Sequence, residues 1–185
     1  MTSDIPSDIP SDIPSELITY YLEMRDPGQL MPARMPEIPL EVRRSRIVYP
    51  ALSRFLYAEV GAAYEWTMRL RWSEAEWLAW LDRPQQQTWI GYVQGTPAGY
   101  FELEAQPEAN VELAYFGLLP PFVGKGYGGA LLTAAIQRAW DMDARRVWVH
   151  TCNLDHPMAL RNYQARGFQL YDTVRTPRPA PEGAP

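Results

Sequence analysis

Hydrophobic and polar positions along the chain repeat with two periods, one typical of strands and one typical of helices. Segments rich in β-branched and aromatic residues predict strands at residues 16–24, 88–94, 98–104, 111–118, 146–151 and 168–174, with a further extended segment at 40–46. Apolar residues at helical spacing predict helices at residues 51–63, 73–81, 128–140 and 158–166. The second of these helices begins with a capping box, because Glu76 follows Ser73 by three residues.

The order of these elements predicts the fold class. Three strands follow one another in the middle of the chain, and Gly95-Thr96-Pro97 is a hairpin signal between the first two. A strand, a helix and a strand come next, which is typical of a crossover connection. We therefore expect an α/β domain with a mixed, mostly antiparallel sheet flanked by helices.

The two ends of the chain differ in composition from the rest. Residues 3–14 repeat Ser-Asp-Ile-Pro three times, and residues 176–185 are again rich in proline. Proline in every fourth place blocks a helix, and the repeat has too few apolar side chains to pack. We predict a disordered tail at 1–14, one domain at 15–175 and a proline-rich tail at 176–185; a partner-binding role for the repeat stays open.

Composition narrows the class of protein. The chain has 185 residues, a formal net charge of −5, two histidines and one cysteine, Cys152. No apolar run approaches the ~20 residues of a membrane span, no secretory signal is evident, and one cysteine permits no internal disulfide. We expect a cytoplasmic protein that binds no membrane, no metal and, without a basic stripe, no nucleic acid. The acidic balance favours a cationic amine substrate.

A glycine-rich segment, Gly124-Lys125-Gly126-Tyr127-Gly128-Gly129, lies between a predicted strand and a predicted helix. Glycine lets backbone amides approach a ligand closely, and a helix N-terminus adds unpaired N–H groups, so the segment predicts a phosphate cradle. No hydroxyl residue follows Lys125, as a nucleotide P-loop requires, and Leu131 replaces the third glycine of the dinucleotide fingerprint.

Two signatures in the right order resemble those of the GCN5-related N-acetyltransferase (GNAT) superfamily. The pattern Gln/Arg-x-x-Gly-x-Gly/Ala falls on Val123 to Gly128, with valine in place of Gln or Arg. Tyr163, Gly167 and Phe168 match the spacing of a second signature, in which His156 takes the usual asparagine position. The resemblance covers the C-terminal part of the domain well and the first hundred residues only by general pattern.

This resemblance implies a coenzyme site. Such a protein uses acetyl-CoA and transfers the acetyl group directly to a primary amine in a ternary complex, with the coenzyme between two splayed strands, here 111–118 and 146–151. The residues that it assigns to coenzyme binding are Leu118, Leu119, Val123, Gly124, Lys125, Gly126, Tyr127, Gly128, Gly129, Asn153 and His156.

The resemblance to the GNAT superfamily also implies catalytic residues. We expect Glu112 to be the general base and to share a strand face with Ala114 and Phe116. If Glu112 is instead a solvated strand glutamate without a catalytic role, Glu102 and Glu104 are the next candidates for the base. Tyr163 is the expected acid for the thiolate, with core packing as its alternative. Structural roles are favoured for both His150 and His156, and a contact with the coenzyme is the functional alternative for His156.

Aromatic residues mark the expected acceptor wall, namely Tyr64, Trp66 and Trp72, because aromatic faces attract ammonium groups. Core packing is the alternative for all three. The acceptor is a small molecule or a peptide amine, and a homodimer stays open. The rival functions are a non-catalytic acyl-CoA-binding module, a transferase of longer acyl groups, and an interaction protein that works through its N-terminal repeat.

Overall fold

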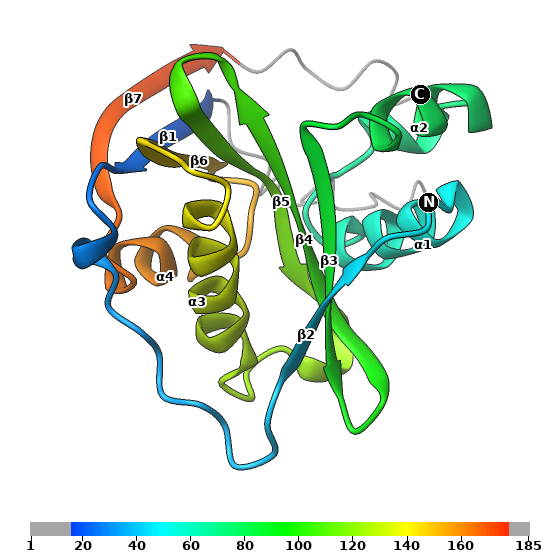
Figure 1. Cartoon of the computed structure of the whole chain (residues 1–185). Helices are drawn as coiled ribbons and strands as arrows, with labels where there is room; N and C mark the ends of the chain where they lie inside the picture. The colour runs from blue at the N-terminus through cyan, green and yellow to red at the C-terminus, as the bar shows by residue number, and fades with distance from the viewer. Residues whose placement is uncertain (1–15, 178–185) are drawn as a thin grey trace, which may run out of the picture.

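The computed structural model describes residues 16–177, which form one seven-stranded sheet with helices on both faces (Figure 1). The strands lie in the order β2-β3-β4-β5-β6-β1-β7. Only the β5–β6 pair is parallel among these neighbours, and the others are antiparallel. The strand bounds are β1 Glu16–Met24, β2 Glu41–Ser45, β3 Gln86–Val93, β4 Thr96–Gln106, β5 Asn110–Leu118, β6 Arg146–Cys152 and β7 Gln169–Pro177.

Helices α1 and α2 cover one face of the sheet, and α3 and α4 cover the other (Figure 1). Their bounds are α1 Pro50–Gly61, α2 Glu74–Leu81, α3 Tyr127–Trp140 and α4 Ala159–Ala165. The alternation of β4 divides the core, since Phe101 packs in the cluster with α3 and Tyr100 packs in the cluster with α1. The expected mixed α/β fold is confirmed.

The predicted elements are all present, with ends that differ by a few residues. The capping box of Ser73 and Glu76 forms at the start of α2, as expected. β7 includes Thr176 and Pro177, so the strand extends two residues into the predicted C-terminal tail. The predicted tail at 1–14 lies outside the described residues. Within residues 16–177 no helix has the length and apolar character needed to cross a membrane.

β5 and β6 pair over a short stretch only. Their register joins Asn110 with Arg146, Val111 with Val147 and Glu112 with Trp148, and no pairing follows. The strands therefore separate beyond Glu112, which opens the sheet at the place where the expected coenzyme site lies.

A bulge in β5 changes which side chains share a face. Glu102 of β4 lies opposite Tyr115 but its neighbour Leu103 lies opposite Leu113, so Ala114 is an extra residue. Glu112 consequently shares its face with Tyr115. The expectation that Glu112 shares a face with Phe116 is wrong, because strict alternation holds only where neither strand carries an extra residue.

Candidate active site

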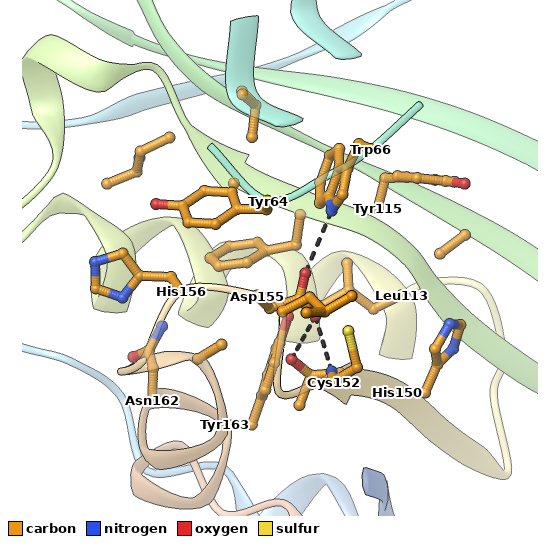
Figure 2. A pocket seen from close by; sticks show the side chains of 18 of the residues that line it. Tyr64, Trp66, Leu113, Tyr115, His150, Cys152, Asp155, His156, Asn162 and Tyr163 are labelled. Atoms are coloured by element: carbon orange, nitrogen blue, oxygen red, sulfur yellow. Dashed lines mark hydrogen bonds between the residues drawn. The ribbon is translucent and has the colours of Figure 1, made fainter. Parts of the chain in front are cut away.

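A pocket of about 1060 Å³ occupies the gap between the separating strands. β5 supplies the wall from Glu112 to Leu118, and β6 supplies the wall from His150 to Cys152. The connection between α1 and α2 closes one side, and the start of α3 together with α4 closes the other. Figure 2 shows the labelled side chains of the lining gathered around Asp155.

The glycine-rich segment forms the N-terminus of α3. Gly124 (φ 77°) and Gly126 (φ 84°) adopt the left-handed conformation that favours glycine, and Gly126 is the N-cap. No side chain caps α3, so the first amides of this 14-residue helix keep free N–H groups and a partial positive charge. Gly128 and Gly129 line the pocket at this point. The arrangement suits an anion.

The other residues expected around the coenzyme divide into two groups. Val123 and Leu118 line the pocket, whereas Lys125, Gly126 and Tyr127 are not among its lining residues. Tyr127 is buried and packs edge-on against Phe122, so only its main chain is available to a ligand.

Two expected coenzyme contacts are engaged elsewhere. The main-chain N–H of Leu119 donates to Ala98 O, and Leu119 O accepts from Phe122 N–H. The amide of Asn153 accepts from Ile18 N–H and donates to Glu16 O, which ties it to β1. Neither residue lines the pocket, so the structure does not bring them into the site.

His156 lines the pocket but its Nδ1 has a local role. This atom accepts a hydrogen bond from Met158 N–H at 3.0 Å, which fixes the turn before α4. The ring lies edge-on to Tyr64, 6.0 Å between centroids. The Nε2 side of the ring is therefore the part of His156 left for a ligand.

Tyr163 of α4 reaches the pocket with a buried ring. It packs edge-on against Phe116 and Phe168. Burial raises the pKa of the Tyr163 phenol, and the negative charge of Asp155 raises that pKa further. The hydroxyl thus stays protonated at neutral pH, as a proton donor must.

Asp155 links the turn after β6 to the expected acceptor wall. Its Oδ2 accepts from Thr151 Oγ1 at 2.7 Å and from Cys152 N–H at 2.9 Å, while Oδ1 accepts from Trp66 Nε1 at 3.3 Å (Figure 2). Trp66 and Tyr64 both line the pocket from the α1–α2 connection. The bond from Trp66 across the pocket had no signal in the sequence.

Trp72 lies outside the pocket, contrary to the expectation that it belongs to the acceptor wall. Its ring packs against Trp77 and Trp80, and the guanidinium of Arg69 lies 4.8 Å from its centroid. Trp72 therefore supports a buried aromatic cluster beneath the pocket.

The three candidate glutamates have different partners. Glu102 is fully buried and forms an ion pair with Arg69 at 2.9 Å. Glu104 lines the pocket but forms an ion pair with Arg83 at 2.7 Å. Glu112 also lines the pocket and has no arginine partner among the described residues. Of the three, Glu112 is best placed to exchange a proton.

Glu112 belongs to a chain of side-chain contacts that the sequence did not reveal. Trp148 Nε1 donates to Gln106 Oε1, and Gln106 Nε2 donates to Glu112 Oε2 at 2.7 Å. The other oxygen, Oε1, lies 3.4 Å from His150 Nδ1. His150 thus joins the site, although sequence reasoning favoured a structural role for it.

The uncapped N-terminus of α3 opens into the gap between the separating strands β5 and β6. A family model described as the acetyltransferase (GNAT) family matches residues 49–168, and the chain belongs to this family. An uncharacterized N-acetyltransferase of Mycobacterium tuberculosis is 31% identical over 101 residues, which are 55% of this chain and 64% of that protein. The matched region thus spans less than two thirds of the curated relative's length.

Solved structures show the same fold. A GCN5-related N-acetyltransferase from Kribbella flavida has a TM-score of 0.64 and 19% identity, over 88% of this chain and 58% of that chain. AAC(6')-Iy, in complex with the bisubstrate analog CoA-S-monomethyl-acetylneamine, has a TM-score of 0.57 and 19% identity, over 76% of this chain and 98% of that chain.

Proposed function

We propose that the protein is an acetyl-CoA-dependent N-acetyltransferase that transfers an acetyl group directly to a primary amine within a ternary complex. The single observation that carries this proposal is the uncapped, glycine-rich N-terminus of α3, which opens into the pocket between β5 and β6. A strand gap beside a positively polarised helix end suits a ligand with a long neutral arm and a diphosphate.

The residues present fit this co-substrate. The backbone amides from Gly124 to Gly129 would hold the diphosphate, because no side chain caps α3 and the segment leads into the positive end of this helix. Leu118 of β5 and the Nε2 side of His156 would contact the neutral arm of the coenzyme. Arg161 and Asn162 of α4 line the same end of the pocket, and Arg161 would add a positive charge near the phosphates.

Two side chains would move protons in the reaction. Glu112 would take the proton of the acceptor ammonium, directly or through an intervening group, so that the nitrogen lone pair can attack the thioester carbon. Tyr163 would give its proton to the departing thiolate, for which its raised pKa keeps it in the acid form. No covalent enzyme intermediate is needed.

The acceptor is a small-molecule or peptide amine. Tyr64, Trp66 and Tyr115 line the pocket with aromatic faces, and Glu104 and Glu112 line it with carboxylates. Aromatic faces and carboxylates both favour an ammonium group. The neighbour AAC(6')-Iy, which has a similar fold, is solved in complex with the bisubstrate analog CoA-S-monomethyl-acetylneamine.

Thiol release from acetyl-CoA tests the proposal, with spermidine, amino-acid esters and an aminoglycoside as probe amines. We expect amine-dependent release by the wild type and a loss of about 10²-fold or more in Glu112→Gln. Glu108→Gln is the control, since it removes the same charge at an exposed turn residue.

Each negative result has a defined meaning. If the protein binds acetyl-CoA but releases no thiol with any amine, the result would favour a non-catalytic acyl-CoA-binding module. Release only with a longer acyl-CoA would identify a different acyl donor. Equal rates in Glu112→Gln and the control would reassign the base.

A further inference from the structure

Glu112 and His150 flank the point where β5 and β6 separate. Glu112 is the last residue of β5 that pairs with β6, and its partner is Trp148. His150 follows Trp148 by two residues, so both project from the same face of β6. Glu112 Oε1 and His150 Nδ1 are 3.4 Å apart, and both residues line the pocket.

The pair is held by its neighbours. Gln106 donates to Glu112 Oε2 at 2.7 Å and accepts from Trp148 Nε1 at 3.0 Å, which leaves Oε1 directed to the imidazole. The His150 ring lies against Tyr21 of β1 at 5.9 Å and against Trp148 at 6.0 Å between centroids. Rings on two strands and a carboxylate on a third therefore restrict its orientation.

The two members of the pair differ in access. The Glu112 side chain is 12% exposed, whereas the His150 side chain is 47% exposed. Glu112 has one oxygen bonded to Gln106 and the other beside His150. A group that enters the pocket consequently meets the imidazole more readily than the carboxylate.

We propose that His150 is a catalytic residue and the group through which Glu112 exchanges the acceptor's proton. The inference rests on the proposed acetyl transfer and deepens it. His150 donates Nδ1–H to Glu112 Oε1, so that Nε2 keeps its lone pair and accepts a proton from the acceptor ammonium. The Glu112 carboxylate then stabilises the imidazolium, as an acidic partner does for a catalytic histidine.

The protons and bonds balance. The neutral amine forms a C–N bond to the acetyl carbon, and the C–S bond breaks with its electron pair on sulfur. Tyr163 protonates the thiolate and recovers a proton from the nitrogen by way of water, while the imidazolium releases the first proton to solvent. Ammonium and acetyl-CoA thus become amide, free thiol and one proton.

Few other titratable groups face the imidazole. From β1 it meets Tyr21, which also packs against Tyr171 of β7, and from β5 it meets Glu112. Arg146 lies farther along β6 and is paired with Glu23 at 2.6 Å. Glu112 is the acidic group among these that contacts the ring.

The test combines a spectroscopic and a kinetic measurement on the full chain. The chain has two histidines, so the ¹⁵N signals of His150 are those that disappear in His150→Asn. We expect the neutral His150 ring to carry its proton on Nδ1 in the wild type and on Nε2 in Glu112→Gln. With spermidine or an aminoglycoside as acceptor, we expect His150→Asn to lower kcat about 10²-fold or more while the acetyl-CoA Kd stays within about twofold.

The double variant decides whether the two residues act as one unit. We expect His150→Asn/Glu112→Gln to lose no more activity than the more damaged single variant, since residues that act together are strongly non-additive. Additive losses, a wild-type kcat in His150→Asn, or an Nε2–H ring in the wild type would each overturn the role of His150. A wild type that binds acetyl-CoA but acetylates no amine would instead overturn the proposed function, and the role of His150 with it.

Discussion

Tyr163 shows how far a match to a family signature can place one residue. Its distance from Gly167 and Phe168 placed it in the site, and the structure places its ring at the pocket between Phe116 and Phe168. Asn153 is a contrary case, because its expected role ignored a partner, Ile18, that lies 135 positions away in the sequence. Trp72 is another, because its ring packs against Trp77 instead of lining the pocket. A side chain's partner across the fold decides whether it faces a ligand, and spacing does not contain that information.

The raised pKa of Tyr163 leads to a prediction about pH. An acid whose pKa lies above its usual value of about 10 stays protonated through neutral and mildly alkaline pH, so Tyr163 itself should cause no loss of kcat between about pH 7 and 10. Tyr163→Phe removes the donor, and we expect kcat to fall about 10²-fold across this range. Steady-state thiol release at several pH values measures both effects.

Tyr49→Phe is the matched control, since it removes a hydroxyl from an exposed tyrosine just before α1. A kcat for Tyr163→Phe equal to that of the control would mean that Tyr163 only packs in the core. An alkaline loss of activity that Tyr163→Phe abolishes would contradict the raised pKa.

At the scale of elements, the sequence pattern predicted the strands and α-helices of residues 16–177, but neither the short 3₁₀ helices nor the bulge in β5. The bulge depends on register, since Ala114 is extra only relative to β4. Periodicity describes one strand at a time, so it placed Glu112 beside Phe116 when the fold places it beside Tyr115. The contact between His150 and Glu112 could not be predicted from one strand either, because it follows from the pairing of β5 with β6.

A buried ion pair joins the α1–α2 connection to the sheet. Arg69 lies in the short 3₁₀ turn Met68–Arg71 and pairs with Glu102 of β4, with 5% and 1% of the two side chains exposed. The guanidinium also lies 3.9 Å from the ring centroid of Tyr115 and 4.0 Å from that of Trp80. Because this connection carries Tyr64 and Trp66, the pair supports the acceptor wall.

We expect Arg69→Met to lower the free energy of unfolding by about 3–5 kcal/mol, because it leaves the Glu102 carboxylate buried without its ion-pair partner. The double variant Arg69→Met/Glu102→Met should lose less, since it removes both charges. Urea denaturation measures these changes.

The exposed pair Arg43–Glu41 provides the comparison, with 74% and 62% of its side chains exposed. Arg43→Met should cost about 1 kcal/mol or less. A similar loss for Arg69→Met and Arg43→Met, or a double variant as unstable as the sum of its single variants, would show that the buried pair does not stabilise the fold.

At the scale of the whole molecule, the sequence predicted the fold class and the glycine-rich start of α3, but not the shape of the pocket wall opposite it. The glycine-rich segment is contiguous in the sequence, so it could be recognised there. The pocket wall combines β5, β6 and the α1–α2 connection, which are distant in the sequence. The bond between Trp66 and Asp155 spans 89 positions in the chain. Contacts at such separations need the folded chain, so acceptor identity and oligomeric state stay predictions.

The measurement that tests the central claim most directly is calorimetric titration of acetyl-CoA into the wild type, Gly126→Val and Gly95→Val. Gly126 (φ 84°) and Gly95 (φ 80°) have the same left-handed conformation, so valine strains both. Gly126 is the N-cap of α3, between Gly124 and Gly128, which line the pocket, whereas Gly95 lies in the β3–β4 turn away from the pocket. We predict a micromolar Kd for the wild type and for Gly95→Val, and a Kd at least tenfold weaker for Gly126→Val. No detectable binding by the folded wild type, or equal binding by all three proteins, would contradict a coenzyme cradle at the N-terminus of α3.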